Sequence, residues 1–281
     1  MLVKFLFTTD KLSVQVHPSD HYAMQNERSA GKTEMWHVLQ AEPGARIAIG
    51  FRKEFLRVDR ETLRRAMQSG EIEQMLDWLE AYAGDTFFVP AGTVHAIGAG
   101  IVLCEIQQNS DVTYRLYDYM RPGTDGRPRQ LHLERGVDVI RQQTSGGRTV
   151  PLEYTSQQGI RLCLAACPYF ATEKMTLDSP AQYEIQYESK DRFEIWIGLE
   201  GEAQFEAAQG AASCGKGEAV IIPADCGPFR VRPNTRSVFL RTYQPDLDRD
   251  VIAPLRAQGY SDLQLRQVCF DCATLAKGDA A

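Results

Sequence analysis

Apolar and polar side chains alternate along residues 12–18, whose sequence is LSVQVHP. Apolar residues occupy the first three even positions, and Gln15 and His17 occupy odd positions. A period of two predicts a β-strand with one apolar and one polar face. A solvated face would more often carry charged side chains, whereas an amide and an imidazole two residues apart can point two ligand atoms into one cavity. The pattern therefore predicts a strand that lines a binding site.

Two further strands with candidate functional side chains are predicted at residues 33–39 and 101–107. In the first, Glu34 and Trp36 share a face, so that Glu34 can enter a cavity while Trp36 packs beneath it. Glu105 lies on the odd-numbered face of the second strand. If the alternation resumes after a bend, the same face gains three more polar residues, Asp111, Thr113 and Arg115.

A fourth piece comes from residues 84–92, which read as a strand ending in a Pro-Ala-Gly turn, and from His95, which follows at the start of the next strand. His95 thus joins Gln15, His17 and Glu34 as a candidate ligand. Imidazole nitrogens with carboxylate and amide oxygens suit a borderline divalent ion such as Zn²⁺.

The hydrophobic period changes within residues 59–79, where Leu and Met recur at helical spacing and Gly70 interrupts the run. We interpret this stretch as two short helices, within a helical insertion at about residues 55–82 between strands. Residues 133–141 are also expected to be helical. The polar, Gly-containing residues 142–150 are the best candidate for a linker.

The second half of the chain repeats the first in weakened form. Residues 217–225 resemble residues 84–92, and residues 194–196 (EIW) resemble residues 34–36 (EMW). Continuing the first alignment puts Pro228 at the position of His95, and every histidine lies at or before His132. Short strands with Gly and Pro turns, occurring twice, indicate two β-sandwich or jelly-roll modules. We expect residues 1–141 to hold the metal and residues 151–281 to lack a metal site.

Composition narrows the functional classes. The chain has 281 residues, 43% of them hydrophobic, and a formal net charge of −6. This acidic balance argues against a general nucleic-acid surface or an anionic-membrane surface. Seven cysteines do not form the pattern of a secreted disulfide scaffold, and no apolar run is long enough to span a bilayer. We therefore expect a cytoplasmic protein.

The motifs in residues 12–18, 31–39, 89–96, 105–111 and 114–118, in this order, resemble those of the type I phosphomannose isomerases, most closely the short bacterial form. The resemblance implies a mainly β fold of two cupin modules. It also implies one Zn²⁺ per chain, with four ligands: Gln15, His17, Glu34 and His95. Members of that family carry a further segment before the equivalent of residues 2–5.

The resemblance implies a reaction as well, the interconversion of mannose 6-phosphate and fructose 6-phosphate through an enediol(ate). Four more residues match polar positions of the family's pocket. Arg115 could stabilise the enediolate or bind phosphate, and Lys32 could assist proton transfer or bind an anion. Asp111 could orient Arg115 or transfer a proton, and Glu105 is a further carboxylate. The sequence leaves the general base open.

Three other functions fit parts of the pattern. The chain could isomerise another sugar, since the metal site would look the same. It could be a non-catalytic cupin that binds a sugar or metal in a regulatory role, although Lys32, Asp111 and Arg115 beside a ligand set favour an enzyme. A cupin oxygenase is disfavoured because a Gln ligand and a glutamate-rich pocket fit zinc better than redox iron.

Overall fold

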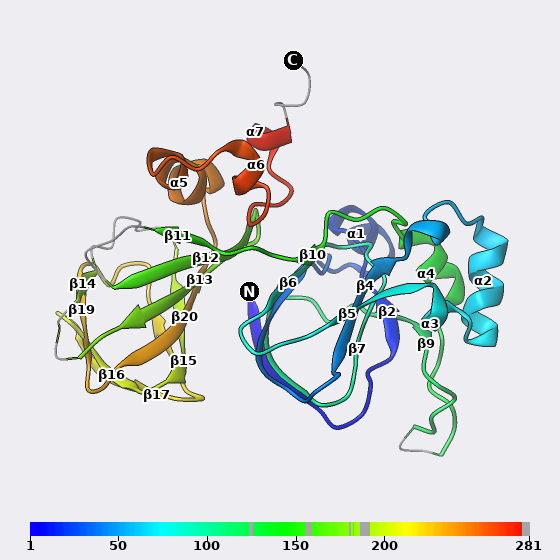
Figure 1. Cartoon of the computed structure of the whole chain (residues 1–281), viewed down its shortest axis with the longest axis horizontal. Helices are drawn as coiled ribbons and strands as arrows, with labels where there is room; N and C mark the ends of the chain where they lie inside the picture. Colours follow the sequence, from blue (N-terminus) through cyan, green and yellow to red (C-terminus); the bar gives the residue numbers. More distant parts are fainter. Residues whose placement is uncertain (124–125, 155–158, 180, 182, 186–191, 277–281) are drawn as a thin grey trace. The chain divides into compact units, whose positions relative to one another are not determined.

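The structure is a computed structural model that describes residues 1–123, 126–154, 159–179, 181, 183–185 and 192–276 (Figure 1). The chain divides into two compact units, Met1–Arg148 and Thr149–Ala281. Each unit is built from two antiparallel sheets. The mainly β architecture expected from the alternating pattern is confirmed.

The first unit packs two five-stranded sheets face to face. One sheet has the order β1 (Leu2–Thr8), β8 (Ile101–Gln107), β3 (Glu34–Ala41), β6 (Thr86–Val89) and β10 (Gly147–Arg148). The other has the order β5 (Leu76–Glu80), β4 (Arg46–Phe51), β7 (His95–Ile97), β2 (Val14–Val16) and β9 (Tyr114–Tyr117). Apolar residues of both sheets, among them Trp36, Ile47 and Phe87, form a buried core between them.

Short helices cover one end of the first unit: α1 (Asp20–Glu27), η1 (Lys53–Phe55), α2 (Arg60–Ser69), α3 (Ile72–Met75) and α4 (Leu133–Val139). Figure 1 shows α2 and α4 beside one another, next to β9. Helix α2 begins where the Asp59 side chain accepts a hydrogen bond from the Thr62 amide, and it ends at Gly70 with φ 85°. Its buried residues, including Leu63 and Met67, join the core beneath β2 and β9.

The structure corrects the extent of the helical insertion. Residues Leu76–Glu80 form strand β5, which pairs with β4, and are not the end of a helix. Leu76 is buried in this pairing, so a tertiary contact overrides the helical spacing. The segment expected as a linker also contributes structure, because Gly147–Arg148 forms strand β10 against β6. Helix α4 ends at Val139, within the range 133–141 expected for it.

The second unit has a six-stranded and a four-stranded sheet. The larger has the order β11 (Leu152–Tyr154), β12 (Ile160–Cys167), β13 (Phe170–Leu177), β20 (Ser237–Tyr243), β15 (Glu194–Glu200) and β18 (Ala219–Ile222). The smaller has the order β14 (Tyr183–Ile185), β19 (Phe229–Pro233), β16 (Glu202–Ala207) and β17 (Gly210–Gly215). Helical segments follow β20: η2 (Asp248–Ile252), α5 (Ala253–Ala257), α6 (Asp262–Leu265) and α7 (Ala273–Ala276).

The strand pairings repeat between the units. In the first unit β3 lies between β8 and β6, and in the second β15 lies between β20 and β18. The β3–β8 ladder shifts register after Val38, and the β15–β20 ladder shifts after Gly198. These shifts occur four residues after Glu34 and Glu194, respectively. Glu34 and Glu194 therefore occupy equivalent positions in the two folds, as the EMW and EIW motifs predicted.

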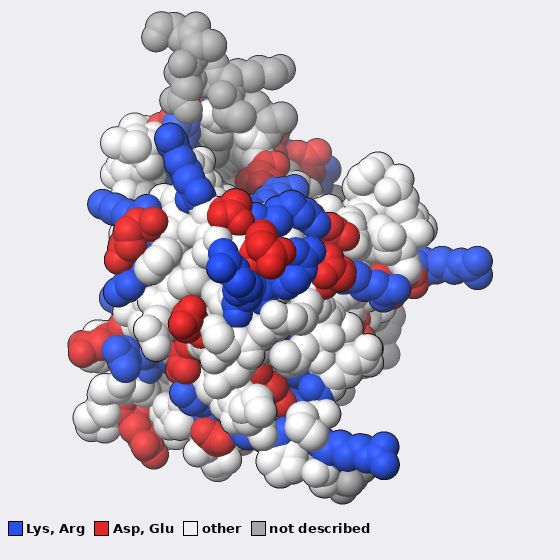
Figure 2. Space-filling view, turned by 90° about the vertical axis from the view of Figure 1, so that its right-hand side faces the viewer, with Lys and Arg blue, Asp and Glu red and all other residues white. Residues whose placement is uncertain are grey.

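The surface carries charges of both signs. Figure 2 shows one face on which Lys and Arg side chains lie intermingled with Asp and Glu side chains. Among the helices of the described residues, none is both long and apolar enough to cross a membrane.

Candidate metal centre and active site

Three side chains of the first unit converge in its interior. His17, Glu34 and His95 are all buried, and their candidate ligand atoms lie within 4.8 Å of one another. Nε2 of His17 lies 3.6 Å from Oε2 of Glu34, and Nε2 of His95 lies 3.3 Å from Oε1 of Glu34. The carboxylate thus faces both imidazoles.

The two facing sheets position these residues from opposite sides. Glu34 opens β3 in one sheet, while His17 follows β2 and His95 opens β7 in the other. The turn before His95 contains Gly92, whose φ of 89° is unfavourable for a side-chain-bearing residue. The Gly92 amide donates a hydrogen bond of 2.8 Å to the carbonyl of His17, which fixes this turn against the first histidine.

Hydrogen bonds to the main chain set the tautomer of both histidines. Nδ1 of His17 lies 2.9 Å from the carbonyl oxygen of Val112, and Nδ1 of His95 lies 2.9 Å from that of Thr93. A carbonyl can only accept, so we assign the ring proton to Nδ1 in each case. Burial lowers the pKa of both imidazoles, which favours their neutral forms. Each Nε2 therefore presents a lone pair to the cluster, as metal-bound histidines do.

The atoms at the centre of the cluster fit a divalent cation. Within the described part of the chain, neither Oε1 of Glu34 nor Nε2 of His95 has a hydrogen-bond partner, although both atoms are buried. Burial opposes ionisation of Glu34, but nearby positive charge, chiefly that of Lys32, outweighs it and lowers the pKa of Glu34 to about 2. Two neutral imidazoles and an ionised carboxylate form a suitable ligand set for such an ion.

Gln15, the fourth predicted ligand, lies on β2 directly opposite His95 on β7. Residues paired across two strands point to the same face of a sheet, so Gln15 faces the interior with His95. Its side chain is partly buried. The structure thus brings the four predicted residues to one region, and their role as ligands stays a prediction.

Charged side chains of alternating sign extend from the cluster along the interior. Nζ of Lys32 lies 2.9 Å from Oε2 of Glu34 and 3.1 Å from Nε2 of His17. It lies 4.0 Å from Glu105, which in turn lies 3.4 Å from Nζ of Lys4. Lys4 was not among the predicted site residues. A single charged residue within the apolar sequence LVKFLF was the available signal.

Glu105 differs from Glu34 in its protonation. Burial, reinforced by the negative charge of Glu34, raises the pKa of Glu105 to about 7, although Lys32 and Lys4 partly offset this rise. Burial alone would lower the pKa of Lys32, but Glu34 and Glu105, and more weakly Asp111, raise it. Glu105 can therefore gain and lose a proton near neutral pH beside a lysine that stays charged.

This environment of Glu105 predicts a pH-dependent stability of the metal-free protein. Because its pKa is raised on folding, the folded state binds more protons between about pH 4.5 and 7. As the pH rises through that window, the unfolding free energy of the wild type should therefore fall by about 3 kcal/mol relative to that of Glu105→Gln. This figure follows from 1.36 kcal/mol per pKa unit. Urea unfolding of chelator-treated protein at several pH values measures the difference. Parallel pH curves for the two proteins would contradict the buried, protonated carboxyl.

Arg115 and Asp111 do not continue the face that carries Glu105. Arg115 lies on β9 in the opposite sheet, and Asp111 lies in the exposed loop between β8 and β9. The expected continuation of the alternation is therefore wrong, because the chain crosses from one sheet to the other after Gln107. Arg115 nevertheless pairs with Gln15 across β9 and β2, so its side chain starts on the same face as Gln15. Asp111 lines a surface cavity of about 620 Å³ together with Tyr114.

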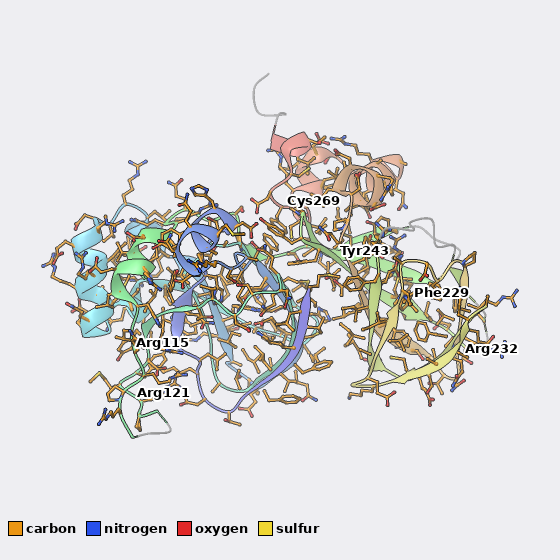
Figure 3. All side chains as sticks on the ribbon, turned by 180° about the vertical axis from the view of Figure 1, so that it is seen from behind. Arg115, Arg121, Phe229, Arg232, Tyr243 and Cys269 are labelled. Atoms are coloured by element: carbon orange, nitrogen blue, oxygen red, sulfur yellow. The ribbon has the colours of Figure 1, made fainter. Side chains whose placement is uncertain are left out.

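More arginines lie near Arg115. Arg121 and Arg129 both bind the buried carboxylate of Asp118, at distances of 2.7 and 2.5 Å. Figure 3 shows Arg121 near Arg115 in the first unit. Burial and then the charge of Arg129 lower the pKa of Arg115. The first unit thus contains a local basic cluster against an acidic whole-chain balance.

Comparison with known proteins agrees with this architecture. Residues 161–241 match the family model described as mannose-6-phosphate isomerase, cupin domain. The chain is 34% identical over 232 residues to the mannose-6-phosphate isomerase ManA of Bacillus subtilis, covering 82% of this chain and 71% of that protein. The chain belongs to the mannose-6-phosphate isomerase family. The type I resemblance inferred from the sequence motifs is thereby confirmed.

Other relatives of the mannose-6-phosphate isomerase family support the assignment. The mannose-6-phosphate isomerase of Streptococcus mutans is 33% identical over 254 residues, covering 90% of this chain and 73% of that protein. The crystal structure of the Bacillus subtilis enzyme superposes with a TM-score of 0.76 at 28% identity, covering 86% of this chain and 74% of that chain. The predicted pair of cupin modules is therefore confirmed as the fold.

In this member of the mannose-6-phosphate isomerase family, the second unit carries a salt-bridge network at the position of the first unit's cluster. Arg241 donates a hydrogen bond of 2.7 Å to Oε2 of Glu194, the equivalent of Glu34. Trp36 pairs with Glu105 across β3 and β8, and Trp196 pairs with Arg241 across β15 and β20. Arg241 thus occupies the position of Glu105.

Arg241 has the opposite charge to Glu105, its equivalent in the first unit, and the neighbouring strand shows the same reversal of charge. Lys4 pairs with Glu105 in the first unit, and Glu173 pairs with Arg241 in the second. Glu173 is buried and accepts hydrogen bonds from Arg161 and from the hydroxyl of Tyr243. The guanidinium of Arg241 thus pairs with Glu194, the carboxylate equivalent to Glu34. No second His/Cys/Asp/Glu metal cluster occurs among the described residues.

Proposed function

We propose that this protein is a zinc-dependent aldose–ketose isomerase that interconverts mannose 6-phosphate and fructose 6-phosphate. The observation that carries the proposal is the buried His17, Glu34 and His95 cluster, beside Lys32 and Glu105, in a chain of this family. Gln15 would complete the ligand set of one Zn²⁺ per chain. A remaining open coordination position is typical of a catalytic zinc.

The chemical difficulty of this reaction is removing a proton from a carbon beside a carbonyl. A proton leaves C2 of the aldose and is delivered to C1, through an enediol(ate). A bound zinc ion would act as a Lewis acid that lowers the cost of the developing negative charge. The proton transfer requires a group that titrates near neutral pH, and a positioned acid–base group contributes roughly 10²–10⁴-fold. The pKa of Glu105, about 7, suits that role.

The remaining predicted residues have roles consistent with their positions. Lys32 stays charged between Glu34 and Glu105 and would hold substrate oxygens or assist the proton transfer. Arg115 starts on the same face of its sheet as Gln15, and its guanidinium would bind substrate oxygens or the phosphate. Asp111 adds negative charge near Lys32 and would orient the substrate or Arg115.

The proposed cellular setting is the cytoplasm. All seven cysteines are free thiols in the structure. Four of them are buried in the second unit: Cys163 and Cys167 in β12, Cys214 in β17, and Cys269 after α6. Free, buried thiols are typical of a reducing compartment. The proposed partner is therefore a small phosphorylated sugar of the cytoplasm, without a nucleic acid or a membrane.

Turnover of mannose 6-phosphate by the purified protein tests the proposal. We expect conversion to fructose 6-phosphate, loss of at least about 99% of the rate after removal of metal by a chelator, and recovery when Zn²⁺ is added back. A coupled assay for fructose 6-phosphate measures the rate. Mannose without the phosphate, assayed in parallel, tests the phosphorylated-sugar assignment.

The outcomes separate the competing functions. A folded, zinc-loaded protein without turnover would contradict the isomerase and favour a sugar- or metal-binding cupin. Equal turnover of mannose and mannose 6-phosphate would contradict the phosphate requirement. Activity that persists after chelation, with no metal detected by elemental analysis, would contradict the metal-dependent reaction.

A further inference from the structure

Arg115 is held by a short segment that precedes helix α4. Strand β9 is the edge strand of its sheet, and the amide and carbonyl of Arg115 bond to His132 on the open side of that edge. The Arg115 amide donates a hydrogen bond of 3.2 Å to Nδ1 of His132, and the Arg115 carbonyl accepts one of 2.8 Å from the His132 amide. The guanidinium donates a third, of 3.1 Å, from Nη1 to the carbonyl of Gln130.

These contacts leave part of the guanidinium available. Nε of Arg115 is buried and has no hydrogen-bond partner within the described residues. The main chain at Arg115 is therefore anchored on both of its polar groups, while one donor of its side chain remains unpaired. A donor held in this way is prepared for an anionic oxygen of a ligand without further ordering.

We propose that His132 is a positioning residue, whose imidazole fixes the main chain at Arg115 and thereby aims the guanidinium at the substrate. The inference rests on the proposed function, since it assigns Arg115 a contact with the substrate. In this role His132 needs no contact of its own with the reacting atoms. It acts through Arg115, because an edge-strand amide without a partner would leave β9 free to shift. A displacement of about 1 Å can cost 10²-fold in rate.

The anchoring requires a neutral imidazole. Nδ1 can accept from the Arg115 amide only when it carries no proton, so the ring proton lies on Nε2. Burial lowers the pKa of His132, and the charges of Arg115 and Arg135 lower it further, while Glu27 opposes them. The neighbouring charged and titratable groups come from α1, the loop before β9, β9 itself and α4: Glu27, Asp111, Tyr114, Arg115 and Arg135. Protonation would replace an acceptor with a donor and add a cation beside two arginines.

Three histidine variants test the inference in the zinc-loaded protein. His132→Ala removes the acceptor, and we expect kcat to fall about tenfold with KM changed less than twofold. His132→Asn places an amide oxygen close to the position of Nδ1, and we expect it to restore kcat to within twofold of wild type. His21→Ala, at an exposed histidine of α1, serves as the matched control and should retain wild-type kcat. Equal rates for His132→Ala and wild type would overturn the inference.

A spectroscopic titration separates positioning from a purely structural role. The backbone amide proton of Arg115 should shift with pH in a ¹H–¹⁵N correlation spectrum, with the same midpoint as the His132 ring. The pH-dependent shift of the Arg115 amide proton should vanish in His132→Asn, because the side chain of asparagine does not titrate. An Arg115 amide that is insensitive to pH while the His132 ring titrates would contradict the hydrogen bond in solution.

The Arg115→Ala variant distinguishes failure of the inference from failure of the proposed function. If wild type does not turn over mannose 6-phosphate, the proposed function fails, while the amide titration still tests the anchoring. If Arg115→Ala retains wild-type kcat, Arg115 does not make the proposed contact with the substrate. The proposed positioning role of His132 would then be contradicted as well. If both residues act together, His132→Ala should cost about tenfold in the wild-type background and less than twofold in the Arg115→Ala background. Equal costs in both backgrounds would overturn the coupling.

Discussion

Replacing Glu34 with glutamine is expected to abolish the proposed zinc binding and to lower kcat/KM for mannose 6-phosphate by about a thousandfold or more. Glu34 is a carboxylate that faces both His17 and His95, and it is ionised, with a pKa of about 2. Glutamine keeps the size of the side chain but lacks the negative charge. In this variant the proposed ligands would be the neutral imidazoles of His17 and His95, the amide of Gln15 and the amide introduced at position 34. None of these is an anion, so binding a divalent cation in a buried site would be unfavourable.

Metal content and turnover measured on the same sample check this prediction. Elemental analysis after zinc loading should give about one zinc per chain for wild type and less than a tenth of that for Glu34→Gln. Glu194→Gln is the matched control, since Glu194 occupies the equivalent position in the second unit. It should retain full zinc content, and its kcat should match wild type at temperatures at which it stays folded. Stoichiometric zinc and normal turnover in Glu34→Gln would contradict the assigned metal centre.

The candidate metal centre was predictable because its residues lie in short segments with clear local patterns. The alternation in residues 12–18 placed Gln15 and His17 on one face, and the position of Glu34 above Trp36 followed from the same period. Strand β2 covers only Val14–Val16, so His17 lies just beyond it, yet its side chain reaches Glu34 and His95 in the interior. The sequence could not show that the two histidines and Glu34 come from facing sheets, since only the tertiary fold brings these together.

Predictions failed where a long-range pairing outweighs a local pattern. Residues 76–80 follow helical spacing, but the edge of β4 offers a partner and the segment becomes β5. The step from Glu105 to Arg115 was treated as one continued face, although the chain changes sheets between them. Lys4 was missed because its partner Glu105 is remote in sequence, and a single Lys in an apolar strand most often lies at the surface.

The second unit shows the same limit more strongly. Glu194 could be aligned with Glu34 from the EIW motif, but its cation could not be named, because Arg241 reaches it across β15 and β20. Glu173 adds a second buried carboxylate, which also contacts Arg241, at 3.4 Å. The unit therefore retains the acidic position equivalent to Glu34 of the candidate metal centre and pairs it with the guanidinium of Arg241.

Arg241→Met is consequently expected to destabilise the second unit by about 3–5 kcal/mol, because it leaves the buried carboxylate of Glu194 without its cationic partner. Glu173 loses one of its two arginines but keeps Arg161. Methionine fills similar volume with an apolar side chain, so the main cost is electrostatic. Urea unfolding followed by circular dichroism measures the loss, with Trp196, which lies against Arg241, as a local fluorescence probe.

A surface pair provides the matched control for that experiment. Arg232 forms an ion pair with Glu206 in which both side chains are exposed, and Figure 3 marks Arg232 in the second unit. The same change, Arg232→Met, should cost less than about 1 kcal/mol, because solvent already screens this pair. Combining Arg241→Met with Glu194→Gln should recover part of the loss, since the carboxylate that lacks a partner is then removed. A cost for Arg241→Met no larger than that for Arg232→Met would show that the guanidinium does not take the place of a metal in this unit.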